Sequence, residues 1–316
     1  MSYVAYVDGQ EGTTGLQIHD LLARRRDIEV LRIAAERRKD DSERKRLLNA
    51  ADVAFLCLPD QAAREAASWV TNSRTCVIDA STAHRVDPAW VFGLPELAPG
   101  HREHLRRSKR ISNPGCHSTA FILLIRPLVD AGLIAPDTRL SATSITGYSG
   151  GGRKLIEQYE ATAVPARLMS PRPYGLSLAH KHVPEMTRWS GLQERPVFMP
   201  VVANFYKGLA VSVPLHFADM ATRTSATRIH EALREHYVNE RFVKTMPLSD
   251  VGALDAGYFD IQACNGTNRC ELFVFAADDR AILLARLDNL GKGASGAAVQ
   301  AMNVHLGLDE GLGLAA

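Results

Sequence analysis

The sequence predicts an α/β protein in which a Rossmann-like, doubly wound parallel sheet is followed by an α+β domain with a mixed, mostly antiparallel sheet. Two observations indicate this fold. Over the first 112 residues, short apolar runs alternate with helical patterns, and such alternation is typical of parallel sheets. After residue 138, strand-like runs follow one another across turn-forming residues such as Asp278-Asp279, which is typical of hairpins. With 316 residues, the chain is long enough for two domains.

Composition excludes several classes of protein. The 37 basic and 35 acidic residues give a net charge of +2, which favours neither a nucleic acid nor a membrane surface as partner. The five cysteines form no C-x-x-C pair, so we expect neither a disulfide framework nor a zinc site, and we expect a reducing compartment. We find no apolar run of about 20 residues that would span a bilayer and no leader-like N-terminus. The sequence therefore predicts a soluble, cytoplasmic protein.

The first predicted strand, residues 3–7, runs into a glycine-rich turn and then an amphipathic helix. The turn reads Asp8-Gly-Gln-Glu-Gly-Thr-Thr-Gly15, with G-x-x-G-x-x-G spacing rather than the G-x-G-x-x-G of the common fingerprint. Backbone N–H groups in this setting can bind a pyrophosphate at the helix N-terminus. We therefore expect a dinucleotide to contact Gly9, Gly12, Thr13, Thr14 and Gly15.

Residues 28–34 form the second predicted strand, and a basic cluster follows it. Arginine near the end of this strand accommodates a 2′-phosphate, whereas an acidic residue suits a free ribose hydroxyl. Arg37 and Arg38 favour NADP, although Glu36 fits NAD. The alternative is an exposed loop that contacts no cofactor.

Two further strands are predicted at residues 52–58 and 76–80, with a helix over 61–70 between them. Ligands of parallel sheets bind beyond the carboxyl ends of the strands. Ser81 and Arg85 follow the last of these strands, so we expect them to hold an anionic group of the substrate. A surface salt bridge is the alternative role for Arg85.

Cys116 follows the turn Asn113-Pro-Gly and precedes a helical pattern that ends near Gly132. The unpaired N–H groups at a helix start lower the pKa of a thiol and favour a nucleophile. We expect Cys116 to be that nucleophile, with backbone donors near Asn113 and Cys116 holding an oxyanion. The alternative is that Cys116 is a small core residue.

Two segments of the predicted second domain carry further candidates. A glycine-rich loop, residues 147–154, offers Ser149 and Gly150 for a phosphate or another anion, or it is a flexible hairpin. His180 and His182 stand beside Glu185, and in an extended segment residues i and i+2 point to the same side. We discount metal ligation because no third ligand is near in sequence, and we expect a general base for the thiol.

The remaining elements complete the second domain. Residues 196–202 and 208–215 are predicted to be an antiparallel pair, and residues 224–237 a helix. Three more strands are expected at residues 258–264, 269–276 and 281–287. The small residues of 291–296 permit close approach of the backbone to a ligand or to another helix. The helix over 297–306 is expected to return to the first domain. We therefore place the cofactor domain at 1–116 plus 293–316 and the catalytic and oligomerisation domain at 117–292.

Several motifs together resemble those of N-acetyl-γ-glutamyl-phosphate reductases of the shorter, type 2 class. They are the glycine turn, Ser81-Thr-Ala-His-Arg85, Gly93-Leu-Pro-Glu-Leu97, Asn113-Pro-Gly-Cys116, Tyr148-Ser-Gly-Gly-Gly152, His180-Lys-His-Val-Pro-Glu185 and Gly293-Ala-Ser-Gly-Ala-Ala-Val-Gln300. The resemblance covers nearly the whole chain. It implies a fold like that of aspartate-semialdehyde and glyceraldehyde-3-phosphate dehydrogenases. It also implies the NADP-dependent reduction of N-acetylglutamyl 5-phosphate to the 5-semialdehyde, in arginine biosynthesis.

The resemblance assigns roles to individual residues. It makes Cys116 the nucleophile that forms a thioester and the His180/His182 pair the acid/base, of which we favour His182. Gly293 and Ser295 fall in a cofactor-binding segment, and Ser81, Arg85, Asn113, Ser149, Gly150 and Glu185 are candidates for the acyl-phosphate substrate. A homo-oligomer, dimer or tetramer, is expected. Aspartate-semialdehyde dehydrogenase and a non-catalytic NADP-binding sensor are the alternatives.

Overall fold

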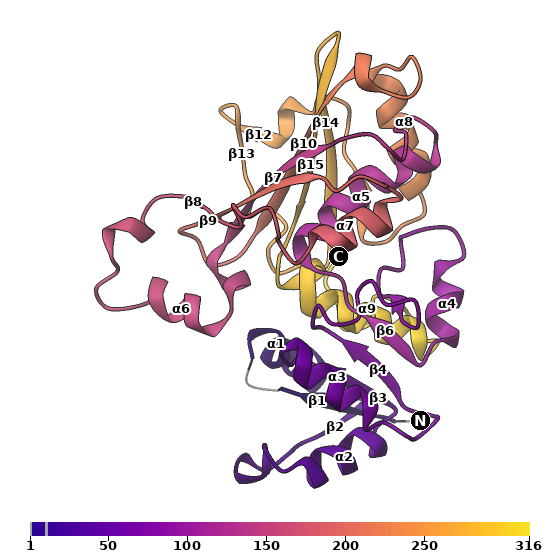
Figure 1. Cartoon of the computed structure of the whole chain (residues 1–316), viewed down its shortest axis with the longest axis vertical. Coiled ribbons are helices and arrows are strands. Elements are labelled where there is room, and N and C mark those ends of the chain that lie inside the picture. The colour runs from indigo at the N-terminus through magenta and orange to yellow at the C-terminus, as the bar shows by residue number, and fades with distance from the viewer. Residues whose placement is uncertain (1, 10–11) are drawn as a thin grey trace. The chain divides into compact units, whose positions relative to one another are not determined.

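The computed structural model describes residues 2–9 and 12–316, and it consists of two compact units. The first unit comprises Met1–Gly115 and Ala294–Leu314, and the second comprises Cys116–Gly293 with Ala315–Ala316 (Figure 1). Gln10 and Glu11 of the predicted dinucleotide turn lie outside the described residues.

A six-stranded, all-parallel sheet forms the centre of the first unit, in the order β2-β1-β3-β4-β6-β5. Its strands are β1 (Tyr3–Asp8), β2 (Ile28–Leu31), β3 (Val53–Leu56), β4 (Cys76–Asp79), β5 (Val91–Phe92) and β6 (Arg110–Ser112). The predicted parallel sheet is thereby confirmed.

The order of the strands places a topological switch point at β1, because β2 pairs on one side of it and β3 on the other. Ligands of doubly wound sheets bind at such a point. The backbones after β1 and β3 approach closely here. Gly9 has φ +89°, and a Cβ atom on it would lie 2.3 Å from the carbonyl oxygen of Cys57. Only glycine fits this position.

Helices cover both faces of this sheet. They are α1 (Thr13–Ala23), α2 (Asp41–Ala50), α3 (Asp60–Ser68), α4 (His101–Arg107) and α9 (Gly296–His305), with a 3₁₀ turn, η1 (Ala35–Arg37). One buried cluster joins α1 and α9 to the strands through side chains such as Ile18 and Met302. A second cluster joins α2 and α3 to the strands, for example through Leu48 and Ala66.

A seven-stranded sheet forms the centre of the second unit, in the order β11-β14-β15-β10-β7-β9-β8. Its strands are β7 (Ser141–Gly147), β8 (Arg172–Pro173), β9 (Val197–Ala203), β10 (Leu209–His216), β11 (Val243–Thr245), β14 (Cys270–Ala276) and β15 (Arg280–Leu287). The pairs β11/β14 and β7/β9 are parallel and the other pairs are antiparallel. The predicted mixed, mostly antiparallel sheet is confirmed.

One predicted pairing and one predicted strand of the second unit are wrong. Strands β9 and β10 do not pair with each other, because β7 lies between them. Their short connection bonds instead to the segment after β7: the carbonyl oxygens of Phe205 and Tyr206 accept from the N–H groups of Tyr148 and Ser149. Residues 258–264 are not one strand either. Only β13 (Tyr258–Phe259) is extended, and it pairs with β12 (Leu254–Asp255) in a separate two-stranded sheet, because the carboxylate of Asp260 accepts from the Gln262 N–H and turns the chain.

The helices of the second unit are α5 (Cys116–Asp130), α6 (Arg153–Tyr159), α7 (Val183–Ser190) and α8 (Ala226–Tyr237). Short helical turns are η2 (Tyr148–Gly151), η3 (Ala166–Leu168), η4 (Phe217–Asp219), η5 (Val251–Ala253) and the π-helical η6 (Gly291–Ser295). Helix α5 packs on β10 and β15 and contacts α7 and α8, so these three helices lie together against one face of the sheet (Figure 1). None of the helices in the described part of the chain is long and apolar enough to cross a membrane.

Candidate active site

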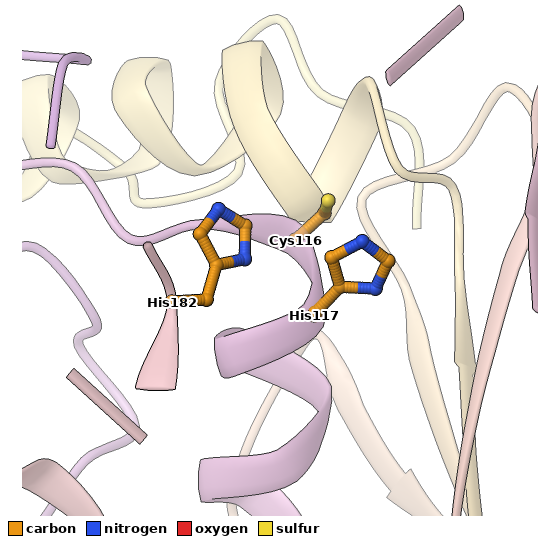
Figure 2. Close-up of side chains that lie close together, drawn as sticks. All are labelled: Cys116, His117 and His182. Atoms are coloured by element: carbon orange, nitrogen blue, oxygen red, sulfur yellow. The ribbon is translucent and has the colours of Figure 1, made fainter. Parts of the chain in front are cut away.

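Cys116 is the first residue of α5, and its side chain is half-buried. The free N–H groups at a helix start favour an anion. One donor atom from each of Cys116, His117 and His182 lies within 4.8 Å of those of the other two, and Figure 2 shows the thiol and the two imidazole rings close together. The structure thus brings the predicted nucleophile and the favoured histidine together.

Other thiols of the chain lie in a different environment. Cys76 and Cys264 are fully buried. Burial, the largest cause, raises the pKa of Cys76 to about 12 and that of Cys264 to about 11. These two sulfurs are therefore inert thiols at neutral pH.

The predicted extended segment around His180 and His182 is not extended. His182 is the residue before α7, and His180 lies in the turn that leads to it. The sequence Val183-Pro184 starts a helix here, because proline is favoured in the first turn of a helix. The rings still lie together, with centroids 4.8 Å apart. The backbone N–H of His182 donates to Nδ1 of His180 at 3.2 Å, so a neutral His180 carries its proton on Nε2.

Glu185 lies one helical turn beyond His182 and is only 1 % exposed. Its Oε1 atom is 4.0 Å from Nε2 of His182. A buried carboxylate attracts an imidazolium and repels a phosphate. The position therefore suits orientation of His182, while the predicted contact of Glu185 with substrate stays a prediction.

Sequence reasoning did not single out His117, which the structure places at the centre of the site. It is buried on α5, with Nδ1 2.8 Å from the Ser144 hydroxyl and Nε2 3.1 Å from the Tyr174 hydroxyl. Burial and, to a smaller extent, His180 and Lys181 lower the pKa of His117 to about 3. The signal in the sequence is a histidine directly after the candidate nucleophile, at the start of an otherwise apolar helix.

The predicted cofactor residues of the η6 segment make contacts inside their own units. A Cβ atom on Gly293 would lie 2.6 Å from Cβ of Cys116. Cys116 therefore has room for its side chain only because residue 293 has none. The hydroxyl of Ser295 donates to Oε1 of Gln17 on α1 at 2.8 Å. Their contact with a cofactor stays a prediction.

The glycine-rich loop after β7 is not a flexible hairpin, because it forms the 3₁₀ helix η2 and then α6. The Ser149 hydroxyl is buried and accepts from Nδ2 of Asn289 at 3.0 Å. Oδ1 of Asn289 accepts from the N–H of Gly208. The side-chain amide of Asn289 thus links the segment after β7 to the connection between β9 and β10, and it fixes Ser149 and the adjacent Gly150.

The first unit holds the predicted dinucleotide turn at the start of α1. Gly12 precedes the helix, and Thr13, Thr14 and Gly15 form its first turn. Position 9 admits only glycine. The backbone of Gly9 and of the first turn of α1 faces the switch point of the sheet, and this arrangement fits a dinucleotide.

Both arginines of the predicted 2′-phosphate site follow β2. Arg37 is exposed and forms ion pairs with Asp40 at 2.8 Å and Glu43 at 3.2 Å. Arg38 is half-buried and its Nε donates to the carbonyl oxygen of Ala35 at 2.8 Å. Both remain predicted cofactor residues.

The Ser81–Arg85 loop is organised by the buried carboxylate of Asp79, which lies at the end of β4. This carboxylate accepts from the Ser81 hydroxyl at 2.7 Å and lies 2.6 Å from Nδ1 of His84. Arg85 is 7 % exposed and donates to the carbonyl oxygen of Ala80. Arg85 is therefore not a surface residue, and its predicted contact with an anion stays a prediction.

Asn113 is buried in the first unit. Its Nδ2 donates to the carbonyl oxygen of Ala294 at 2.9 Å. The side chain thus ties the end of β6 to the segment before α9, and its predicted role beside an oxyanion is not decided by this contact.

Comparison with known proteins defines the class. The family model described as semialdehyde dehydrogenase, NAD binding domain, matches residues 5–107, and the semialdehyde dehydrogenase dimerisation domain matches residues 116–289. The fold is similar to that of aspartate semialdehyde dehydrogenase II from Vibrio cholerae complexed with ASA, with TM-score 0.73, 15% identity and 97% and 98% of the two chains covered. The enzyme from Francisella tularensis gives TM-score 0.72 at 13% identity, with 96% and 99% covered. The chain is thus an oxidoreductase of the semialdehyde dehydrogenase class.

Sequence relatives narrow this class. The N-acetyl-gamma-glutamyl-phosphate reductase 2 of Nostoc sp. is 46% identical over 316 residues, covering 98% of both chains. The reductase of Burkholderia cenocepacia is 45% identical over 96% of both chains, and reductase 2 of Pseudomonas putida is 45% identical over 96% and 97%. The chain belongs to the N-acetyl-γ-glutamyl-phosphate reductase family, as its motifs predicted.

Proposed function

We propose that this chain reduces N-acetylglutamyl 5-phosphate to N-acetylglutamate 5-semialdehyde and phosphate with NADPH as the hydride donor, as a step of arginine biosynthesis in the cytoplasm. The observation that carries the proposal is the thiol of Cys116 at a helix start with the His182 imidazole beside it, in a chain of this family.

Cys116 acts as the nucleophile. Its thiolate sulfur attacks the acyl carbon, the bond from that carbon to the phosphate oxygen breaks, and phosphate leaves. The resulting thioester is a better hydride acceptor than a carboxylate. Reduction gives a thiohemiacetal; its hydroxyl then returns its proton to His182 as the carbon–sulfur bond breaks, which releases the aldehyde and restores the thiolate.

His182 is the acid/base of this scheme. It takes the proton of the Cys116 thiol and later protonates the oxygen that develops on the acyl carbon. Glu185 is buried with Oε1 4.0 Å from Nε2 of His182, so its carboxylate would stabilise a positive charge on this ring. His180 contributes a ring contact and an acceptor for the His182 backbone N–H.

The bound cofactor supplies the hydride. The first turn of α1 and the glycines before it fit the pyrophosphate, and the matched NAD binding domain supports a nicotinamide cofactor. We propose NADP rather than NAD because Arg37 and Arg38 follow β2, where a 2′-phosphate is accommodated. We also propose that Ser81, Arg85, Asn113, Ser149 and Gly150 hold the substrate's carboxylate and phosphate.

A second copy of the chain is the proposed partner. One face of the second sheet carries α5, α7 and α8, and side chains that point to the other face are exposed: Ile145, Val197, Met199 and Ile282, with Val197 57 % and Met199 40 % exposed. Exposed apolar groups gathered in this way mark an interface. The match to a dimerisation domain supports a homo-oligomer.

The test is an assay in the reverse direction. We would follow phosphate-dependent reduction of NADP, and of NAD in parallel, with N-acetylglutamate semialdehyde and with aspartate semialdehyde. We expect turnover with the acetylglutamate substrate and NADP. A clear preference for aspartate semialdehyde would overturn the assignment, and NADP binding without turnover of either aldehyde, together with an unreactive Cys116, would indicate a sensor.

A further inference from the structure

His117 lies at the centre of a cluster of rings in the second unit. Its ring centroid is 5.3 Å from that of His182, 5.5 Å from that of His180 and 5.3 Å from that of Phe198. It also follows Cys116 directly on α5 (Figure 2). Any charge on His117 would therefore act on both groups of the proposed chemistry.

Each ring nitrogen of His117 has a hydroxyl partner. Ser144 on β7 lies 2.8 Å from Nδ1, and Tyr174, just after β8, lies 3.1 Å from Nε2. A hydroxyl can donate or accept, so these two partners satisfy both the N–H and the lone pair of a neutral imidazole. They carry no charge that would balance an imidazolium, whereas His182 has the Glu185 carboxylate 4.0 Å away.

Ionisable side chains from several elements lie near the His117 ring. In the described part of the chain they are Cys116 on α5, Tyr174 after β8, His180, Lys181 and His182 before α7, and Glu185 on α7. Burial, followed by His180 and Lys181, lowers the pKa of His117 to about 3. Burial and, secondly, Cys116 raise the pKa of Tyr174, so its phenol keeps its proton.

We propose that His117 is a positioning residue: held by Ser144 and Tyr174, it stays uncharged throughout the reaction, supports the ring of His182 next to Cys116 and leaves the proton to His182. This inference rests on the proposed function, in which His182 is the acid/base. The physical reason is that a second imidazolium about 5 Å away would oppose protonation of His182.

The direct test is the protonation state of His117. Imidazole ¹⁵N shifts of the full-length protein would be followed from pH 5 to pH 9, with His117→Gln used to assign the signals. We expect His117 to keep the shifts of one neutral tautomer over the whole range. Titration of His117 within it would overturn the proposal. This measurement needs no substrate, so it separates failure of the inference from failure of the proposed function.

Kinetics of variants provide the second test. His117→Gln keeps an uncharged polar group, and we expect it to lower kcat by about tenfold or less, the scale of one lost neutral hydrogen bond, with the pH profile of kcat/KM retained. His117→Ala should be worse. If His117→Gln instead loses as much as His182→Gln, about 10²–10⁴-fold, and a limb of the profile disappears, His117 is the acid/base and the proposal fails.

Two milder variants guard against a folding defect. Ser144→Ala and Tyr174→Phe each remove one hydroxyl from His117, and we expect both to lower kcat by about three- to tenfold with little change in KM. Ser190→Ala and Tyr237→Phe are the matched controls, because their buried hydroxyls bond to the carbonyl oxygens of Met186 and Leu123 instead. If kcat falls equally in the two control variants and in Ser144→Ala and Tyr174→Phe, the effect is one of general packing, and the positioning role is contradicted.

Discussion

Gly293 and Cys116 touch so closely that a Cβ atom on Gly293 would lie 2.6 Å from Cβ of the cysteine. Two Cβ atoms do not approach to this distance, so η6 can run beside the proposed nucleophile only with glycine at position 293. The contact gives Gly293 a role that does not depend on its predicted contact with a cofactor.

Gly293→Ala should therefore displace Cys116. We expect slower alkylation of the thiol and a turnover reduced by about 10²-fold, the cost of a misplacement near 1 Å. The affinity for NADP measured by fluorescence titration separates the two roles: it stays near the wild-type value if Gly293 only admits the cysteine. Gly252→Ala, at an exposed glycine of η5, controls for a general effect.

Cys116→Ser should abolish formation of the acyl-enzyme, because a hydroxyl is a far weaker nucleophile than a thiolate at neutral pH. Mass spectrometry after mixing with N-acetylglutamate semialdehyde and NADP should show the adduct only on the wild-type chain. NADP binding should be nearly intact in the variant. Substantial turnover by Cys116→Ser would make the covalent mechanism untenable.

His182→Asn should lower kcat/KM by about 10²–10⁴-fold, the range for loss of general acid–base catalysis. His180→Asn is the matched variant, since this ring contacts His182 but lies outside the group that His182 forms with Cys116 and His117. We expect the smaller loss there. The reverse order of the two losses would assign the acid/base role to His180.

Acid should destabilise the fold through His117. This imidazole is neutral in the folded chain, where its pKa is about 3, and gains a proton in the unfolded chain below about pH 6.5. Its contribution to stability is therefore complete above pH 6.5 and is lost as the pH falls toward 3. His117→Gln should reduce the slope of the free energy of unfolding against pH by about 1.4 kcal/mol per unit below pH 5.5. Urea titrations at one protomer concentration measure it, and an unchanged slope would contradict the assignment.

Met199→Asp should weaken the homo-oligomer, because it places a charge among the exposed apolar side chains Ile145, Val197 and Ile282 on the face of the second sheet opposite α5. Sedimentation at several concentrations should show dissociation to a 34.6 kDa protomer. Val238→Asp alters an apolar side chain that is 66 % exposed at the end of α8, and it should leave association unchanged. If the two variants behave alike, the sheet face is not the interface.

Local patterns in the sequence were sufficient for much of the fold. The parallel sheet, the glycine turn before α1 and the position of Cys116 at a helix start depend on neighbouring residues, whose periodicity and turn chemistry the sequence displays directly. The pairing of the strands could be predicted less well from the sequence. The chain between β9 and β10 has hairpin length, yet β7 lies between them, because the carbonyl groups of Phe205 and Tyr206 bond to the loop after β7.

The sequence by itself pointed to the candidate residues, namely a thiol at the start of α5, two histidines before α7 and a glycine turn after β1. The comparisons with the reductase family bear out the predicted activity, while the roles of these residues stay predictions. Only the tertiary structure decided how these groups are held. His117 meets Ser144 and Tyr174, and Cys116 meets Gly293, through contacts between elements far apart in the chain. Spacing along the sequence carries no information about such contacts, because packing of the helices against the sheet creates them.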